Sequence, residues 1–167
     1  MANLTHRRIV IMGVSSCGKS TVGELLSQRV GLPYRDGDDM HPPENIAKMS
    51  AGHALDDADR APWLHSIGRW LAAQEGGAIV GCSALKHSYR DIIRAEAPGT
   101  VFVHLNGSYD LLAQRMSARR GHFMPLSLLD SQVETLEPLG AREEGVVLDI
   151  AASPEELAGQ AAEYLTA

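Results

Sequence analysis

The sequence predicts an α/β fold, in which a parallel sheet of about five strands is flanked by helices on both faces. Short apolar runs of strand type alternate with segments whose apolar residues recur at helical spacing along nearly the whole chain. The candidate strands are residues 8–13, 32–36, 78–83, 100–105 and 145–150. Ligands of such sheets bind beyond the carboxyl ends of the strands, so we expect the functional residues in the turns that follow them.

Length and charge narrow the class of protein. The 167 residues, 44% of them hydrophobic and 22% charged, suit one globular domain over residues 1–167. The formal net charge of −6 disfavours a nucleic-acid partner, which usually meets a basic face. Cys17 and Cys82 form no metal-binding spacing, and no apolar run suits a membrane span or a signal peptide. We therefore expect a soluble cytoplasmic protein with no membrane or nucleic-acid partner.

The strongest motif lies between the first predicted strand and the first predicted helix. The strand covers residues 8–13, and the helix covers Gly18–Arg29 and stops at Gly31. The turn reads GVSSCGKS and matches G-x-x-x-x-G-K-[ST] at every specified position. Chance would give such a match with a probability on the order of 1% in a chain of this length. The turn is therefore predicted to be a P-loop that binds the phosphates of a nucleotide.

The residue types of the P-loop suit that chemistry. Its glycines let the backbone wrap closely around phosphate, and its amide N–H groups point inward at the helix start. Lys19 brings a positive charge to the β- and γ-phosphates, and Ser20 offers a hydroxyl to Mg²⁺. The sequence lacks the N-K-x-D signature of G proteins and the long strand with a terminal carboxylate pair that is typical of motor-like ATPases. A small kinase that uses ATP and Mg²⁺ is therefore favoured over a switch or a motor.

The second predicted strand, residues 32–36, leads into the acidic stretch DGDDMHPP, residues 36–43. The carboxyl end of this strand is expected beside the P-loop, where phosphoryl transfer needs Mg²⁺ and a carboxylate that accepts the proton of the attacking hydroxyl. Gly37 permits an irregular turn that brings Asp36 and Asp38 to one site. We predict Asp38 as the catalytic base and substrate anchor, and Asp36 as a partner of Mg²⁺ through water. A solvated turn is the alternative.

Helices are predicted at residues 43–49, 61–75 and 87–95, with the strand 78–83 between the last two. Several cations stand near the edges of these elements and could meet an anionic substrate: Lys48, Arg60, Lys86 and Arg90. Arginine suits a carboxylate because its planar fork binds both oxygens. Ser83 could line the same crevice. For each residue taken singly, an ordinary solvated side chain is the alternative.

The second half of the chain predicts a closing lid. Residues 108–119 and 125–136 are predicted helices, joined by the basic segment RMSARRGHFMP at residues 115–125. A basic connection with a glycine suits a lid that excludes water and stabilises charge in transit, and cations at a helix C-terminus are the structural alternative. A last strand at 145–150 precedes a helix that opens with the capping box Ser153-Pro154-Glu155-Glu156.

Together these motifs resemble the gluconokinase family, a group of P-loop small-metabolite kinases. The resemblance covers nearly the whole chain, and the P-loop is its least specific part. The matching stretches are GVSSCGKST (13–21), DGDDMHPPENIAKMSAGHALDDADRAPWL (36–64), GCSALKHSYRD (81–91) and FVHLNGSYDLLAQRMSARRGHFMPLSLLDSQVETLEPL (102–139).

The resemblance implies ATP-dependent phosphorylation of D-gluconate at its 6-hydroxyl. The product, 6-phospho-D-gluconate, would feed the pentose phosphate or Entner–Doudoroff routes, and the family also implies a homodimer. The residues implied to bind ATP are Gly13, Val14, Ser15, Ser16, Cys17, Gly18, Lys19, Ser20 and Thr21. The residues implied to line the gluconate site are Asp38, His41, Lys48, Arg60, Lys86 and Arg90, which Ser83 and His122 complete.

The resemblance also implies a lid at about 119–136 with Arg119 and Arg120 in it. Arg119 is expected to act in catalysis beside Lys19 and Asp38 and, with Arg115, to bind ATP. Arg115 and Arg120 stay open as alternatives for the catalytic role.

Two other interpretations remain. Another small-metabolite kinase, with shikimate, adenylyl sulfate or a nucleoside monophosphate as acceptor, would share the P-loop. A nucleotide-binding module without catalysis is the alternative from a different class, although intact Lys19, Ser20 and Asp38 argue against it.

Overall fold

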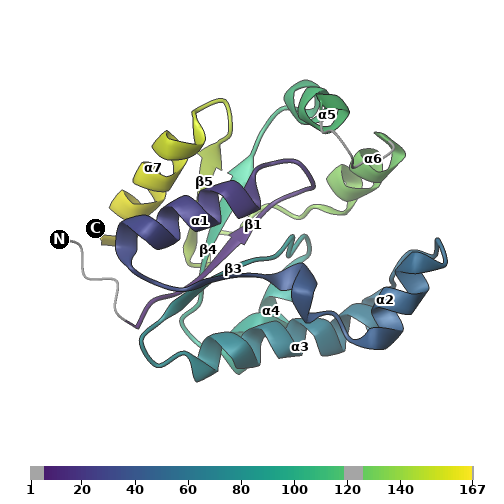
Figure 1. Ribbon diagram of the computed structural model, residues 1–167, viewed down its shortest axis with the longest axis horizontal. Helices are drawn as coiled ribbons and strands as arrows, with labels where there is room; N and C mark the ends of the chain where they lie inside the picture. The colour runs from purple at the N-terminus through teal and green to yellow at the C-terminus, as the bar shows by residue number, and fades with distance from the viewer. Residues whose placement is uncertain (1–5, 119–125, 167) are drawn as a thin grey trace.

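The structure is a computed structural model that describes residues 6–118 and 126–166, and it confirms the predicted α/β fold (Figure 1). Within these residues, five parallel strands form one sheet in the order β2-β3-β1-β4-β5. The strands are β1 (Arg8–Met12), β2 (Tyr34–Asp36), β3 (Ala78–Gly81), β4 (Val101–Asn106) and β5 (Gly145–Asp149).

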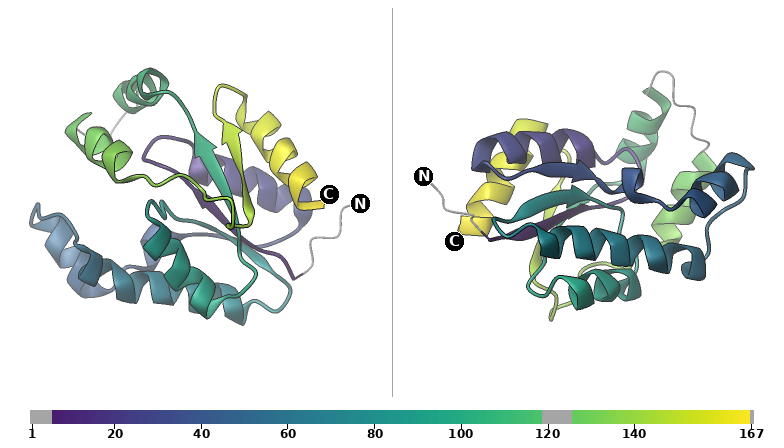
Figure 2. Two further views of the ribbon diagram at one scale, coloured as in Figure 1. Left: turned by 180° about the vertical axis from the view of Figure 1, so that it is seen from behind. Right: turned by 60° about the horizontal axis from the view of Figure 1, so that its bottom comes forward.

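Helices cover both faces of the sheet. The helices of the described residues are α1 (Lys19–Val30), the 3₁₀ helix η1 (Gly37–Met40), α2 (Pro43–Ser50), α3 (Asp57–Ala73), α4 (His87–Glu96), α5 (Tyr109–Ala118), α6 (Leu126–Thr135) and α7 (Pro154–Thr166). Helices α1 and α7 pack together on one face, and α3 and α4 pack together on the other (Figures 1 and 2). In the described ranges, no helix is both long and apolar enough to cross a membrane.

The apolar run of β1 follows from its place in the middle of the sheet. Ile9 and Ile11 belong to the core cluster beneath α1 and α7, whereas Val10 and Met12 belong to the cluster beneath α3 and α4. Successive side chains of a strand point to opposite faces, so a strand covered on both sides needs apolar residues at every position.

The position of β1 also explains where the ligand site lies. Ile9 pairs in register with Ile79 of β3 on one side and with Val101 of β4 on the other. At their carboxyl ends, β1 leads into α1 on one face of the sheet and the adjacent β3 leads into α4 on the other. The chain thus leaves these two strands toward opposite faces, and this is the switch point where ligands bind in sheets of this type. The P-loop begins at this point.

The start of α3 differs from the prediction. The helix begins at Asp57 rather than Ala61, because Asp56 and Asp59 form a reciprocal cap. Asp56 Oδ1 accepts from the backbone N–H of Asp59 at 2.7 Å, and Asp59 Oδ2 accepts from that of Asp56 at 3.0 Å. The apolar periodicity starts only at Trp63, so a polar first turn held by its cap gave no periodic signal.

Candidate active site

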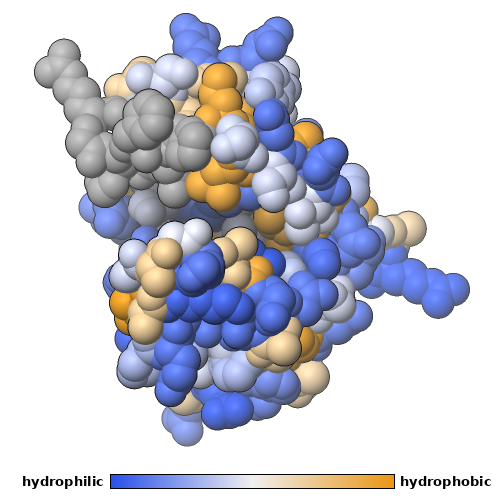
Figure 3. Space-filling model, turned by 90° about the vertical axis from the view of Figure 1, so that its right-hand side faces the viewer, coloured by the Kyte–Doolittle hydropathy of each residue, from blue (hydrophilic) through white to orange (hydrophobic). Residues whose placement is uncertain are grey.

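A pocket of about 480 Å³ opens beside the P-loop at the carboxyl end of the sheet. It brings together the predicted donor-side residues and the two aspartates that follow β2. The lining residues are Ser15, Ser16, Gly18, Lys19, Ser20, Thr21, Tyr34, Asp36, Asp38, Gly81 and Arg115. Figure 3 faces this end of the molecule, where the surface is hollowed between the α6 side and the α2 side.

Two glycines give the P-loop its path. Gly13 has a φ of 149°, and a Cβ there would lie 2.7 Å from both Cys17 Sγ and the carbonyl oxygen of Leu105. Gly18, the N-cap of α1, has a φ of 98°, which side chains of L-residues rarely adopt. Ser16 also has a left-handed φ, of 67°, but it lacks the conformational freedom of glycine. The loop therefore holds Ser16 in a less favourable backbone conformation.

Lys19 lies over the P-loop. Its Nζ donates to the carbonyl oxygens of Gly13 at 2.9 Å and Val14 at 3.2 Å. Gly13, Val14 and Cys17 are buried and do not line the pocket, so they shape the loop from behind. The ammonium group is thus held at the pocket wall by backbone acceptors.

Ser20 and Asp36 lie close enough to share a cation. Ser20 Oγ is 3.5 Å from Asp36 Oδ2, and both residues line the pocket. The other carboxylate oxygen, Asp36 Oδ1, accepts from the backbone N–H of Asp38 at 3.0 Å and so caps η1. Mg²⁺ takes oxygen ligands, commonly one or two from the protein and the rest from water and phosphate. The pair therefore fits Mg²⁺.

The helix η1 turns Asp38 into the same pocket as Asp36. Gly37 makes the turn possible, because it packs so closely on the backbone of Gly81 that it leaves no room for a Cβ. Desolvation by the surrounding protein raises the pKa of the Asp38 carboxyl above its usual range. The nearby Asp36 carboxylate raises this pKa further, whereas Lys19 and His41 act to lower it. A carboxylate with a raised pKa is a better proton acceptor.

Two residues that line the pocket, Tyr34 and Gly81, were not predicted from the sequence. The ring of Tyr34 packs against Gly23 of α1 and Gly81 of β3, and neither glycine leaves room for a Cβ. Burial raises the pKa of Tyr34 to about 12, so its hydroxyl stays protonated beside the pocket. The available signal was a glycine inside a predicted helix and another at the end of a predicted strand, each of which indicates close approach.

His41 stands on the acceptor side of Asp38. Its ring stacks on Trp63, with the ring centroids 4.1 Å apart and the planes 17° apart. Burial lowers the pKa of His41, so the neutral imidazole is favoured. Asn45 Nδ2 lies 3.3 Å from His41 Nδ1 and also donates to the carbonyl oxygen of Asp59. A neutral ring that accepts at Nδ1 carries its proton on Nε2 and can donate there to a hydroxyl.

The predicted substrate-wall cations Lys48, Arg60 and Lys86 each have a partner in α3 or α4. Lys48 and Lys86 pair with acids in the first turn of α3, and Arg60 pairs with the phenol of Tyr89 in α4. Lys48 donates to Asp59, and this hydrogen bond raises the pKa of Lys48. Lys86 Nζ lies 3.2 Å from both oxygens of Asp57.

Arg60 completes this wall through Tyr89. Its Nη1 donates to the hydroxyl of Tyr89 at 2.9 Å, and that hydroxyl donates to Asp57 at 2.5 Å. The hydrogen bonds from Tyr89 and Lys86 lower the pKa of Asp57. Lys48, Arg60 and Lys86 therefore surround the start of α3, outside the residues that line the pocket beside the P-loop.

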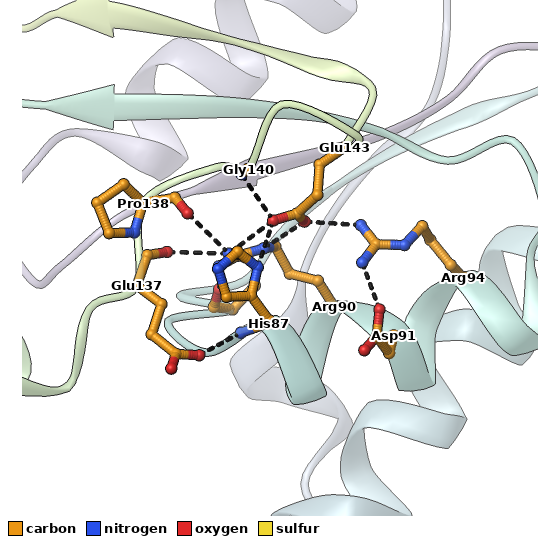
Figure 4. A network of polar contacts seen from close by, with 9 residues as sticks. His87, Arg90, Asp91, Arg94, Glu137, Pro138, Gly140 and Glu143 are labelled. Carbon is orange, nitrogen blue, oxygen red and sulfur yellow. Dashed lines mark hydrogen bonds and ion pairs between the residues drawn. The ribbon is translucent and has the colours of Figure 1, made fainter.

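The prediction that Arg90 lines the substrate site is wrong. Its side chain is 0% exposed, and its Nε and Nη2 donate to the two oxygens of Glu143 at 2.7 and 3.0 Å (Figure 4). The Nη groups also donate to the carbonyl oxygens of Ala84 and Glu137 at 2.7 and 2.9 Å. With these donors used inside the protein, Arg90 braces α4 against the chain that follows α6.

Glu143 is the centre of that brace. Arg94 Nη1 donates to it at 2.8 Å, and the backbone N–H of Gly140 donates at 3.0 Å. Burial acts to raise the pKa of Glu143, but the hydrogen bonds from Arg90, Gly140 and Arg94 outweigh it and hold the pKa well below its usual range. The buried Arg90 thus has a countercharge and a hydrogen-bond acceptor at each of its three nitrogens, as such a group requires.

The remaining predicted residues separate into two groups. Arg115 lines the pocket and donates from Nη2 to the carbonyl oxygen of Ile150 at 2.7 Å. Ser83 is half-buried behind the P-loop, and its carbonyl oxygen accepts from the backbone N–H of Gly13 at 3.3 Å. Arg119, Arg120 and His122 lie outside the described residues.

Comparison with known proteins assigns the family. The family model described as Shikimate kinase matches residues 15–156. A gluconokinase of Gluconobacter oxydans is 49% identical over 140 residues, which cover 82% of this chain and 79% of that protein. The chain belongs to the gluconokinase family of P-loop kinases. It is accordingly a phosphotransferase.

Solved structures agree with this assignment. A gluconokinase from Sinorhizobium meliloti, known from its crystal structure, is 50% identical in sequence to this chain. The two structures superpose with a TM-score of 0.88 over 96% of this chain and 92% of that one. Shikimate kinase from Aquifex aeolicus covers 92% of each chain with a TM-score of 0.60 at 18% identity, a likeness that shows the shared fold alone. Identity thus separates the gluconokinases from the wider group.

Proposed function

We propose that the protein transfers the γ-phosphoryl group of ATP to the 6-hydroxyl of D-gluconate, giving 6-phospho-D-gluconate and ADP. The proposal rests mainly on one observation: Lys19 and Asp38 line the same pocket. The cations Lys48, Arg60 and Lys86 lie beyond Asp38, around the start of α3. The relatives named gluconokinases support gluconate as the acceptor.

On the donor side, the P-loop holds the phosphates. Backbone N–H groups and Lys19 bind the β- and γ-phosphate oxygens, and Ser15, Ser16 and Gly18 to Thr21 supply the pocket wall around them. Ser20 and Asp36 would hold Mg²⁺, Asp36 through water, and the ion would neutralise charge on the phosphates. Arg115 reaches the same pocket and contributes a further cation to ATP.

On the acceptor side, Asp38 orients the 6-hydroxyl and accepts its proton as the oxygen attacks the γ-phosphorus. Its raised pKa strengthens it as a base. His41 donates from Nε2 to a neighbouring hydroxyl, since its Nδ1 faces Asn45. Both groups come from the chain between β2 and α2, so one local segment holds the reacting end of the acceptor.

The wall around the start of α3 suits the rest of gluconate, which has one carboxylate and five hydroxyls. Arg60 and Lys86 provide positive charge for the carboxylate, and Lys48 and Ser83 provide further polar contacts. Asp57 and Asp59 hold these cations in place. The carboxylate of gluconate would therefore meet cations that Asp57 and Asp59 already hold in position.

Several further features complete the proposal. Residues 1–167 form one kinase domain, and a lid over about 119–136 closes on the phosphates, with Arg119 acting in catalysis and His122 contacting the acceptor. The protein works as a cytoplasmic homodimer that supplies 6-phospho-D-gluconate to the pentose phosphate or Entner–Doudoroff route. It has no nucleic-acid or membrane partner.

A coupled assay tests the function directly. ATP, Mg²⁺ and gluconate are supplied, and 6-phosphogluconate dehydrogenase reports the product through its nicotinamide cofactor. We expect gluconate to give turnover and shikimate, adenylyl sulfate and nucleoside monophosphates to give far less. Faster phosphorylation of shikimate would replace the proposal with another small-metabolite kinase. Binding of a non-hydrolysable ATP analogue without turnover of any sugar acid would favour a module that has lost catalysis.

A further inference from the structure

A side chain of helix α6 forms a hydrogen bond with the P-loop. Gln132 Oε1 accepts from the backbone N–H of Ser15 at 2.7 Å, across 117 residues of sequence. A backbone N–H can only donate, so the atom that faces it is the carboxamide oxygen and the orientation of the amide is fixed. The partner, Ser15, is itself a lining residue of the pocket.

The first half of the P-loop makes few other hydrogen bonds among the described residues. Lys19 Nζ donates to the carbonyl oxygens of Gly13 at 2.9 Å and Val14 at 3.2 Å. The backbone N–H groups of Gly13 and Cys17 donate to Ser83 and Val14, both at 3.3 Å. The hydrogen bond between the Ser15 N–H and Gln132 is shorter than any of these. Ser15 directly precedes Ser16, which has a left-handed backbone conformation. A side chain from α6 therefore holds the backbone N–H of Ser15, in addition to the local contacts of the loop.

The segment that follows α6 is anchored as well. The backbone N–H of Glu137 donates to the carbonyl oxygen of Leu85 at 2.7 Å, and the Glu137 carboxylate accepts from the backbone N–H of His87 at 2.7 Å. The Arg90–Glu143 brace holds the residues beyond it (Figure 4). These contacts anchor the chain just beyond α6, so Gln132 lies near the anchored end of the segment proposed as the lid.

We propose that Gln132 is a positioning residue for phosphoryl transfer. Its Oε1 fixes the amide of Ser15 and so sets the first half of the P-loop for the phosphates, and its neutral carboxamide lies beside the bound polyanion. The inference rests on the proposed kinase function and adds to it a requirement that this group accept a hydrogen bond and carry no charge.

Two variants separate the two requirements. Gln132→Met keeps the length of the side chain and removes the acceptor, whereas Gln132→Glu keeps an acceptor oxygen and adds a negative charge. Glu134→Gln is the matched control, because Glu134 is exposed on the same helix. For each protein, the Kd of the Mg²⁺ complex of the non-hydrolysable analogue AMP-PNP is measured by calorimetry. Hydrogen exchange of residues 13–17, the melting temperature, and kcat and KM for ATP are measured beside it.

We expect Gln132→Met to raise the Kd roughly fivefold to tenfold, the effect of one hydrogen bond, and to speed exchange in residues 13–17. Gln132→Glu should retain slow exchange yet raise the Kd by more than Gln132→Met does, because a carboxylate beside phosphates is repelled. The control should match the parent in every measurement. All three proteins should melt close to the parent.

A Kd within twofold of the parent for either Gln132 variant overturns the proposal. So does a loss of binding that is accompanied by an equal loss in the melting temperature, which would make Gln132 a support of the fold only. The analogue-binding series needs no acceptor. A parent that binds AMP-PNP but leaves gluconate unphosphorylated would refute the proposed function and leave this inference to be judged on binding alone.

Discussion

The donor side of the pocket is one continuous stretch of backbone, whereas the acceptor side is assembled from side chains of η1, α2, α3 and α4. Residues 13–21 form the donor side, and their positions follow from two glycines and the start of α1. On the acceptor side, Lys48, Arg60 and Lys86 are held by partners from separate elements. Backbone recognition is fixed by local sequence, and side-chain recognition depends on how distant elements meet.

Asp38 joins the two sides, so its substitution gives the largest expected effect. We expect Asp38→Asn to reduce kcat by about 10²- to 10⁴-fold, because general-base catalysis typically contributes that much, while the Kd for ATP stays within a few fold of the parent. Steady-state kinetics and calorimetry with AMP-PNP measure the two effects. Asp39→Asn, on the exposed neighbour, should leave both unchanged.

The pH profile sharpens the assignment. A base must be deprotonated, so kcat/KM should fall as the pH drops through the pKa of Asp38, and crowding by protein atoms places that acidic limb above the usual aspartate range. Near-normal turnover of Asp38→Asn would show that the base is another group.

Buried Arg90 gives the next largest effect, on stability rather than on substrate affinity. Arg90→Met leaves Glu143 buried with a weaker countercharge, and breaking a buried pair of this kind costs about 3–5 kcal/mol of the free energy of unfolding. Urea denaturation measures this loss. At a temperature where the variant is folded, its KM for gluconate should match that of the parent, and a large rise there would return Arg90 to the substrate wall.

The same pair has a defined pH dependence. The pKa of Glu143 is lower in the folded protein than in the unfolded chain, so its contribution to stability is complete above about pH 4.3, the usual glutamate value. The contribution is lost as the pH falls from there toward the lowered folded pKa. The stability gap between the parent and Arg90→Met should therefore narrow in acid.

The error over Arg90 shows what the sequence could predict. The parallel sheet covered by helices needed only the alternation of strands and helices, and the P-loop needed only a local motif, so both could be predicted. Arg90 and Lys86 look alike in sequence, four residues apart in one segment. Lys86 stands at the start of α4 and remains partly exposed, whereas Arg90 lies one turn further on, facing Glu143, which is 53 residues away.

Contacts over long sequence separations account for the other omissions. Tyr34 enters the pocket because Gly23 and Gly81 make space for its ring, and Gln132 reaches Ser15 across 117 residues. Neither contact has a periodic or motif signal of its own. Glycine positions were the only local trace of the first contact, and the second has none.

The donor side has its own test in Lys19→Ala. We expect kcat/KM for ATP to fall roughly 10²- to 10³-fold, because a preorganised charge at the transferring phosphoryl group is lost, while KM for gluconate changes little. Lys48→Ala is the matched acceptor-side variant and should raise KM for gluconate without changing KM for ATP. If each variant changes KM for ATP and KM for gluconate to the same extent, the donor and acceptor sides of the pocket do not act separately.

Lys86 on the acceptor side gives the smallest effect. Its ammonium group is already paired with Asp57 near the surface, and exposed ion pairs contribute little, so Lys86→Met should raise KM for gluconate only roughly two- to fivefold with kcat unchanged. Salt screens exposed charges, so the difference from the parent should shrink between low and high ionic strength. Arg69→Met removes an exposed cation further along α3 and is the control. A salt-independent rise well above tenfold would instead mean that the Lys86 charge becomes buried against the substrate carboxylate when gluconate binds.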